Sequence, residues 1–183
     1  MCTVCSWPEP GLYQDDKLIY TWDQLVEFGY VKMKGTQFNG VHSELTGRLV
    51  ISDEVSGITG RTVLKGTKLD EVYVPGVEHQ LLDHWYATQH VKHFVFYGKD
   101  VIVSDSAFQA CYDLESVTFI NGVGLFKDAA FAGCSSIVSF AIPEGLTKIP
   151  ANCFINCESL REVSIPNSVT TIEKEVFCNC TSL

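Results

Sequence analysis

The chain has 183 residues, of which 46% are hydrophobic and 19% charged, and its formal net charge is −9. This composition supplies enough apolar surface for a folded core and excludes global disorder. The longest apolar stretches are only a few residues, too short for a helix that spans a bilayer. Nucleic-acid binding needs clustered cations, and the lysine pairs 32/34 and 65/68 are too sparse to provide them.

The first ten residues are MCTVCSWPEP. They lack both the basic start and the continuous apolar segment that a secretory signal peptide requires. Two cellular locations are therefore compatible with the sequence. The protein stays in the cytoplasm, or the sequence is a fragment of a longer protein that is secreted or displayed on the cell surface.

Residues 1–39 lack the periodicity that organises the rest of the chain. The sequence TWDQ at 21–24 is typical of a capping box and predicts a short helix over about residues 22–28, stopped by Gly29. We interpret 1–39 as an N-terminal cap and 40–183 as a repeat solenoid. Four apolar side chains of the cap are expected to cover the first coil of the solenoid: Trp22, Leu25, Val26 and Phe28.

Weak copies of a repeat begin near residue 40. Each predicts a strand with two inward-facing side chains, and the three pairs are Leu49 with Ile51, Val72 with Val74, and Phe94 with Phe96. The step between neighbouring copies is 23 residues from Leu49 to Val72 and 22 residues from Val72 to Phe94. About six copies fill residues 40–183, and the last is truncated at Leu183.

The repeat is strong from residue 103 onward. The pattern Phe-x-x-Cys-x-x-Leu/Ile recurs every 23 residues, beginning at Phe108, Phe131, Phe154 and Phe177. An alternating apolar pair follows each of the first three copies, which predicts half-buried strands. Phe and Cys three residues apart fit one tight helical turn that faces inward. No copy can bury these side chains alone, so stacked copies must share one core and a parallel sheet.

Residues 154–172, FINCESLREVSIPNSVTTI, resemble the BspA-like leucine-rich repeat family of bacteria and protists. They match its short helix, Cys, strand, Ile-Pro and Val-x-x-Ile segments, and residues 45–55 are similar to its usual first repeat. The resemblance implies a repeat solenoid, α/β to mainly β, with a parallel sheet on one face and short helical or 3-10 turns on the other. It also implies a non-enzymatic protein-binding module that acts in cell adhesion or recognition.

Two other functions are compatible with this fold. The solenoid could be an inert structural spacer that presents an attached module, or a cytosolic scaffold or inhibitor that binds one target protein. Short catalytic and cofactor motifs (Gly-x-Ser-x-Gly, His-Glu-x-x-His, the P-loop and Gly-x-Gly-x-x-Gly) are absent from the sequence, so we predict neither an enzyme nor a cofactor.

The cysteines follow the repeat. Four of the eight occupy one column, at 111, 134, 157 and 180, and Cys153 takes a position that alanine holds in the two preceding copies. We interpret them as small buried hydrophobic side chains rather than as disulfides or metal ligands. Cys2-x-x-Cys5 is half of a possible zinc site, with no second Cys or His pair nearby in the sequence.

Histidines cluster in the most divergent copy. Four of the five lie within 15 residues, at His79, His84, His90 and His93, with Asp83 among them. A metal site would need several of these side chains to converge on one point. Their distribution over a loop, a turn and a strand favours polar surface residues, and no metal is predicted.

A candidate partner-binding patch lies on the outer face of two adjacent strands: Glu71, Tyr73, His93, Val95 and Tyr97, bordered by Arg48. Strands about 4.8 Å apart would make these side chains contiguous. Tyrosine favours interfaces because it buries apolar area and keeps a hydroxyl for hydrogen bonds. The alternative is that a loop of the cap, or the segment 76–90, folds over the patch.

The expected partner is a protein, with no nucleic acid and no membrane span. The truncated last coil would expose an apolar column and unpaired strand edges. We therefore expect either that the natural protein continues beyond Leu183 or that two chains associate end to end.

Overall fold

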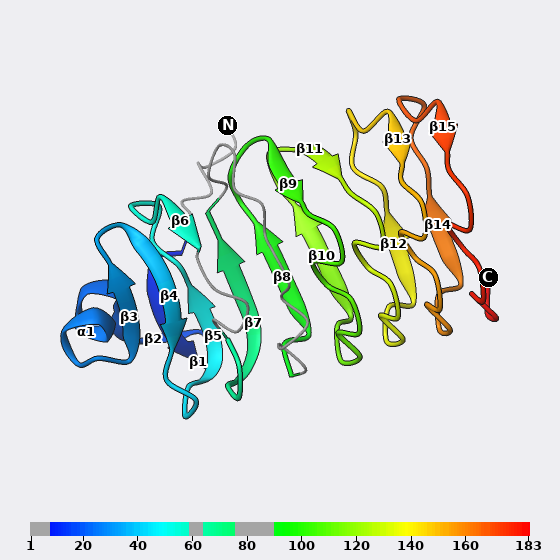
Figure 1. Ribbon diagram of the computed structural model, residues 1–183. Coiled ribbons are helices and arrows are strands. Elements are labelled where there is room, and N and C mark those ends of the chain that lie inside the picture. The colour runs from blue at the N-terminus through cyan, green and yellow to red at the C-terminus, as the bar shows by residue number, and fades with distance from the viewer. Residues whose placement is uncertain (1–7, 59–63, 76–89) are drawn as a thin grey trace, which may run out of the picture.

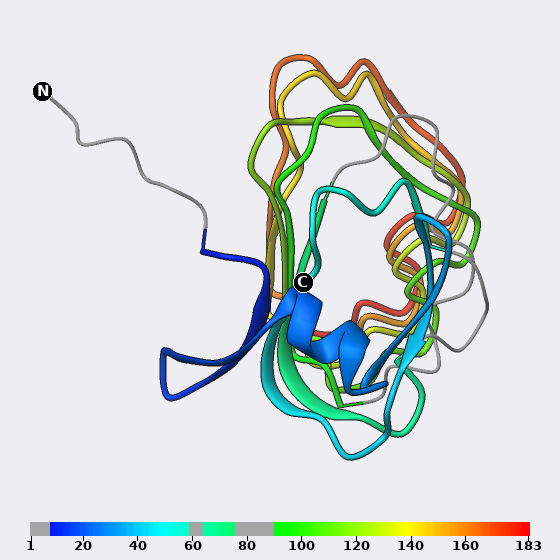
Figure 2. The same ribbon diagram turned by 90° about the vertical axis from the view of Figure 1, so that its left-hand side faces the viewer.

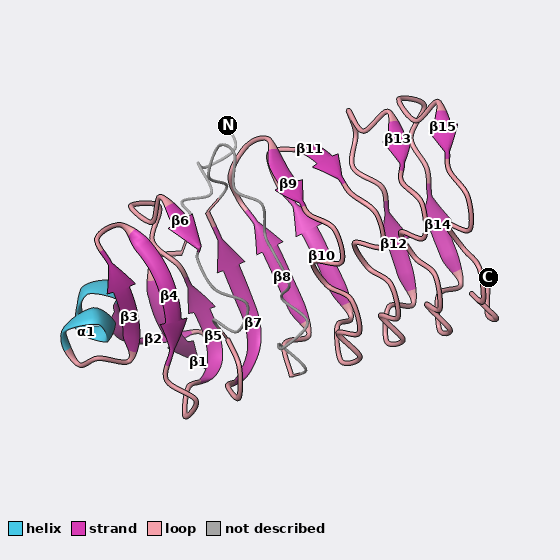
Figure 3. Cartoon of the chain, in the orientation of Figure 1, coloured by secondary structure: helices cyan, strands magenta, loops and turns pink. Residues whose placement is uncertain are grey.

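The computed structural model describes residues 8–58, 64–75 and 90–183. The chain winds into successive coils that stack side by side (Figure 1), and the view along the stack shows the coils superposed around one axis (Figure 2). Strands dominate and helix is scarce (Figure 3). The predicted fold class, a leucine-rich-repeat solenoid with parallel strands, is confirmed.

The N-terminal end of the stack is built from two hairpins and one helix. Its elements are β1 (Gly11–Gln14), β2 (Lys17–Thr21), α1 (Trp22–Glu27), β3 (Val31–Lys34) and β4 (Gln37–Val41). The Thr21 side chain accepts a hydrogen bond from the Gln24 N–H, and the Gln24 side chain accepts one from the Thr21 N–H, so the predicted capping box is present. No helix in the described residues is long and apolar enough to cross a membrane.

Two of the four side chains predicted to cover the first coil are buried. Trp22 and Leu25 are buried, but Val26 is 38% and Phe28 56% exposed. The helix is only six residues long and turns one stripe toward the core, and Phe28 lies just beyond its end. Phe28 packs edge-on against Tyr20 instead, with ring centroids 6.0 Å apart. The division between cap and repeats at residues 39 and 40 stays a prediction.

One six-stranded sheet joins the N-terminal β1–β2 hairpin to strands of the successive coils. Its order is β10-β8-β7-β5-β1-β2. Four of its strands come from successive coils and are parallel: β5 (Thr46–Val50), β7 (Lys68–Val74), β8 (His93–Phe96) and β10 (Ser116–Phe119). The β1–β2 hairpin joins β5 in antiparallel fashion. Along β7 and β8 the inward side chains are buried and the outward ones are half-buried or exposed, as the alternation predicts.

The remaining strands are short and belong to four smaller sheets. They are β6 (Gly57–Ile58), β9 (Val101–Val103), β11 (Val123–Phe126), β12 (Ser139–Ala141), β13 (Lys148–Ile149), β14 (Glu162–Ser164) and β15 (Thr171–Ile172). β12 pairs with β14, β9 with β11 and β13 with β15, all in parallel, and β6 pairs with β4. No ladder joins β10 to β12 in the part of the chain that the structure describes, so the repeat sheet is split at this junction.

Tight turns form the side of the solenoid away from the sheet. They contain 3-10-type hydrogen bonds such as Cys111 N–H to the Phe108 carbonyl, as expected, and from residue 90 onward they form no continuous helix. In each of the four turns from residue 106 onward, two residues four positions apart take left-handed conformations, which reverse the chain. These pairs are Ser106 and Ala110, Ala129 and Gly133, Asn152 and Asn156, and Glu175 and Asn179. Backbone bonds then tie each turn to the next, for example Phe108 N–H to the Ala130 carbonyl at 2.8 Å.

A column of stacked phenylalanine rings forms the centre of the core. Phe108, Phe131 and Phe154 have no exposed surface, and Phe177 continues the stack at the end of the chain. Successive ring centroids are 5.4, 5.4 and 5.8 Å apart, with nearly parallel planes. The 23-residue step therefore places each ring against its equivalents in the neighbouring coils.

The cysteine column runs beside the rings. Cys111, Cys134, Cys153 and Cys157 are all buried, which confirms the structural interpretation for these four. The Cys134 thiol donates to the Phe108 carbonyl oxygen at 3.1 Å, and the Cys157 thiol donates to that of Phe131 at 3.2 Å. A thiol thus links each coil to the previous one. Cys180 is only partly buried, and Cys2 and Cys5 lie outside the described residues.

We expect these core thiols to resist alkylation in the folded protein. Burial raises the pKa of Cys134 and Cys153 well above its ordinary value and that of Cys157 to about 12, so the reactive thiolate is scarce at pH 8. Iodoacetamide should label exposed Cys178 in native protein, and the core thiols only after denaturation. Peptide mass spectrometry resolves each site. Rapid native labelling of all the core thiols would contradict their burial.

Candidate protein-binding surface

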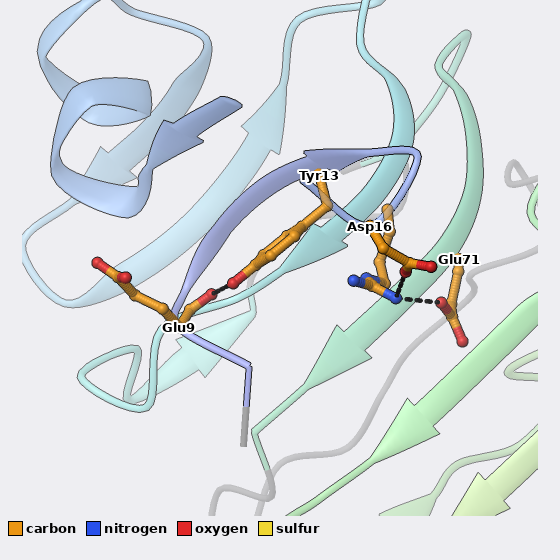
Figure 4. A network of polar contacts seen from close by, with 5 residues as sticks. Glu9, Tyr13, Asp16 and Glu71 are labelled. Atoms are coloured by element: carbon orange, nitrogen blue, oxygen red, sulfur yellow. Dashed lines mark hydrogen bonds and ion pairs between the residues drawn. The ribbon is translucent and has the colours of Figure 1, made fainter. Parts of the chain in front are cut away.

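Arg48 is the centre of a polar network that includes Asp16 and Glu71, two of the residues labelled in Figure 4. It lies on β5, and its guanidinium carbon is 4.7 Å from the centroid of the Tyr13 ring on β1 and 5.8 Å from that of Tyr73 on β7. Its Nη1 atom is 2.8 Å from an Asp16 carboxylate oxygen and 3.7 Å from one of Glu71. Two rings and two carboxylates therefore hold the guanidinium in one orientation.

The network depends on the conformation of the β1–β2 hairpin. Asp15 and Asp16 form its two-residue turn, with φ of 47° and 59°, a conformation that suits Asp and gives a tight hairpin. The turn carries the Asp16 carboxylate over β5. Tyr13 is nearly buried, and its hydroxyl donates to the Glu9 carbonyl oxygen at 2.7 Å. Burial first, and then Glu9, raises the pKa of Tyr13, so the phenol stays protonated.

An open groove of about 280 Å³ lies beside the network around Arg48. It is lined by Tyr13, Gln14, Asp15, Asp16, Gly47, Arg48, Asp70, Glu71 and His93. Four of these side chains are carboxylic acids, against one arginine and one histidine. Because Arg48 already contacts Asp16 and Glu71, the carboxylates of Asp15 and Asp70 leave the groove with an excess of negative charge. The groove therefore favours a partner with basic side chains.

The structure brings four of the five predicted patch residues together. Glu71 lies directly beside His93, and Tyr73 beside Val95, across the parallel ladder of β7 and β8. All four side chains are half-buried and point away from the core. Burial, followed by the charge of Glu71, raises the pKa of Tyr73, which leaves its hydroxyl protonated at neutral pH. Residues 76–89, which could cover the patch, lie outside the described residues.

Tyr97 is placed differently from the other four. It follows the end of β8, and its hydroxyl donates to the carbonyl oxygen of Ile51, which follows β5 two strands away. Burial is the main cause that raises the pKa of this phenol. The Tyr97 side chain ties together the ends of the strands, so its polar group already has a partner within the fold.

The two described histidines of the predicted cluster contact different partners. His90 is 3.5 Å from an Asp113 carboxylate oxygen, whereas the Nδ1 of His93 is 2.9 Å from the Ser116 hydroxyl. His79, His84 and Asp83 lie outside the described residues. Across 8–58, 64–75 and 90–183, no three His, Cys, Asp or Glu side chains are grouped as metal ligands.

Sequence reasoning did not find Tyr13 and Asp16, which contribute half of the contacts to Arg48. The signal was present, because Asp15-Asp16 separates two short segments with alternating apolar residues, a pattern typical of a hairpin. Nothing in that local pattern indicates that the hairpin pairs with β5, about 35 residues further along the chain.

Comparisons with known proteins agree with this architecture. A family model described as a BspA type leucine rich repeat region matches residues 59–183 in six copies. A crystal structure of a leucine-rich repeat protein from Bacteroides ovatus ATCC 8483 superposes with a TM-score of 0.60 at 23% identity, over 75% of this chain. This chain spans 36% of that protein's length.

A leucine-rich repeat protein of T. pallidum, TpLRR, superposes with a TM-score of 0.48 at 16% identity, over 84% of this chain and 86% of the other. No curated protein matches the sequence. The family model covers more than two thirds of the chain, and the matched repeats coincide with the stacked coils described above. The chain therefore belongs to the BspA-type leucine-rich repeat family.

Proposed function

We propose that this chain is a non-enzymatic protein-binding module whose partner contacts the outer face of β5, β7 and β8 beside the β1–β2 hairpin. Leucine-rich repeat proteins are in general protein-interaction modules. The observation that carries the proposal is the fixed orientation of Arg48 between two tyrosine rings, next to an acidic groove. Binding at a surface whose side chains are already ordered costs little conformational entropy.

The chemistry of the surface defines the kind of partner. The acidic groove favours a segment with lysine or arginine, and the half-buried Tyr73 and Val95 offer apolar area beside it. By analogy with the family, we propose recognition of a protein on another cell. An inert spacer, or a scaffold that binds one cytosolic target, remains the alternative if no segment binds at this surface.

We expect Glu71→Ala with Tyr73→Ala to weaken binding by about 1–3 kcal/mol, because interface tyrosines and desolvated charges commonly carry such energies. Ligands would first be selected from a displayed peptide library on the wild-type chain, and their dissociation constants then measured by calorimetry. Sequences with lysine or arginine next to an aromatic residue should be enriched.

A matched control uses Glu162, which occupies on β14 the same repeat position as Glu71 on β7. Glu162→Ala removes the same charge at a distant coil and should leave the affinity unchanged. Equal affinities for the wild type and the Glu71/Tyr73 variant would remove this surface from consideration. Enrichment of no ligand at all would favour the spacer.

A further inference from the structure

The split in the repeat sheet contains a cleft. Between β10 and β12 the structure has an open space of about 340 Å³, lined by residues 116–119 on one side and 139–143 on the other. Parallel ladders join β5 to β7, β7 to β8, β8 to β10 and β12 to β14, whereas none joins β10 to β12 or β11 to β13 within the described residues. β10 and β12 follow one another in the stack (Figure 1) without pairing, and the cleft lies between them.

The edge of β10 that faces the cleft has free backbone groups. In a parallel sheet, alternate residues direct their N–H and C=O groups toward opposite neighbours. Ile120, just after β10, donates its N–H to the Phe96 carbonyl oxygen at 2.9 Å, so even-numbered residues face β8. The backbone N–H and C=O groups of Val117 and Phe119 consequently point toward β12. No hydrogen bond joins β10 to β12 within the described residues.

The edge of β12 has the complementary arrangement. Ile142, just after β12, donates its N–H to the Ser164 carbonyl oxygen at 2.9 Å, which directs even-numbered residues toward β14. Ser139 and Ala141 therefore direct their backbone groups toward β10. Each side of the cleft thus offers two donors and two acceptors at the spacing of a strand.

The side chains give the cleft an apolar floor. Val117 and Phe119 are half-buried, whereas Phe94 and Phe96, at the same positions one coil earlier, are 0% and 1% exposed. Below them Phe140 is only 5% exposed and packs 5.1 Å from Phe131, centroid to centroid, so the core stays closed. The exposed apolar surface of this floor is therefore contributed by Val117 and Phe119.

The opposite side of the solenoid remains joined at this junction. The Phe108 and Ala110 N–H groups each donate to a carbonyl of the next coil at 2.8 Å. The two coils are consequently open along the sheet and connected along the turns, an arrangement that permits rotation about the turns. Neighbouring strands are about 4.8 Å apart, so a third strand between β10 and β12 requires these two strands to lie about 9.6 Å apart.

We propose that this cleft binds an extended peptide segment as a parallel strand between β10 and β12. Backbone donors and acceptors on both sides specify a strand rather than a helix or a small molecule. The apolar floor selects a segment with an apolar side chain at every second position. The cleft lies one strand beyond β8 and uses the strand edges of β10 and β12 rather than the outer face around Arg48, so either proposal can fail without the other.

The first test is amide hydrogen exchange with a defined peptide. The probe is acetyl-REVSI-amide, the sequence of residues 161–165, whose Val and Ile repeat the inward-facing pair of the family strand. In the free chain, the amides of Val117, Phe119 and Ala141 should exchange rapidly and that of Phe140 slowly. Saturating peptide should slow the first three by at least about tenfold, because each gains a ladder bond.

A peptide of the same sequence with every amide N-methylated is the matched ligand. It keeps the side chains but cannot donate, and should bind at least about tenfold more weakly. Equal binding of the two peptides would overturn the proposal, because apolar contact alone would then explain the affinity. Slow exchange of the Val117, Phe119 and Ala141 amides in the free chain would also overturn it.

Two disulfide variants provide the protein control, both made in a chain with Cys178→Ser to remove an exposed thiol. Thr118→Cys with Ala141→Cys joins the two strands across the cleft and should abolish peptide binding when oxidised and restore it when reduced. Ala141→Cys with Ser164→Cys joins residues that are already register partners and should have no effect. Binding that persists in the oxidised Thr118/Ala141 variant would overturn the proposal.

Discussion

Replacing Phe131 with alanine should lower the free energy of unfolding by about 3–5 kcal/mol, because it leaves a cavity at the centre of the ring column. Phe131 has no exposed surface, and its ring stacks on Phe108 and Phe154, each 5.4 Å away. The substitution removes contacts to both neighbouring coils at once. Because the backbone hydrogen bonds between coils hold the neighbouring rings in place, these rings fill little of the cavity. Denaturant unfolding followed by circular dichroism measures the change.

Phe177→Ala is the matched control for this substitution. Its ring stacks on a single neighbour, Phe154, at 5.8 Å, and is only partly buried at the end of the stack. The same chemical change should therefore cost clearly less there. Equal losses at Phe131 and Phe177 would mean that the column does not carry the stability assigned to it.

Gly47→Ala is expected to detach the β1–β2 hairpin and to lower the free energy of unfolding by roughly 3 kcal/mol. Gly47 has φ of +90°, and a Cβ atom built there would overlap the carbonyl oxygen of Tyr13 on β1. Both the backbone strain and the overlap fall on the pairing of β1 with β5. The detached hairpin should become sensitive to limited proteolysis near Asp15 and Asp16.

A matching substitution at Gly145 distinguishes the backbone strain from the steric overlap. It has the same φ of +90°, but a Cβ atom there meets nothing within 4 Å. Gly145→Ala should therefore cost only the conformational strain, about 1–2 kcal/mol, and leave proteolysis of the hairpin unchanged. A loss as large as that at Gly47 would show that close packing against β1 contributes nothing.

The repeat made the core predictable from the sequence. A constant step of 23 residues places Phe108, Phe131 and Phe154 in register, and their mutual burial then follows from stacking alone. Alternation along β7 and β8 likewise predicted which side chains face outward, including Glu71 and Tyr73. Tyr97 escaped this logic because β8 ends at Phe96, and beyond the strand the alternation no longer fixes where a side chain points.

Two features could not be derived from periodicity. The N-terminal segment that contains β1 has no repeat, so the pairing of β1 with β5 depends on contacts between segments far apart in the sequence. The split between β10 and β12 occurs where the 23-residue step is uninterrupted, and it reflects how far apart the backbones lie rather than which residue type stands in each column. The repeat pattern predicts which residues of neighbouring coils lie next to each other, but it does not predict how far apart their backbones are.

The split sheet also has a consequence for how the chain unfolds. In a stacked array each coil is coupled only to its neighbours, so cooperativity is limited by the weakest junction. Between β10 and β12 the turns contribute hydrogen bonds and the sheet contributes none within the described residues. We therefore expect the protein to behave as two folding units, one ending with β11 and one beginning with the Phe131 turn, whose melting separates under mild denaturant.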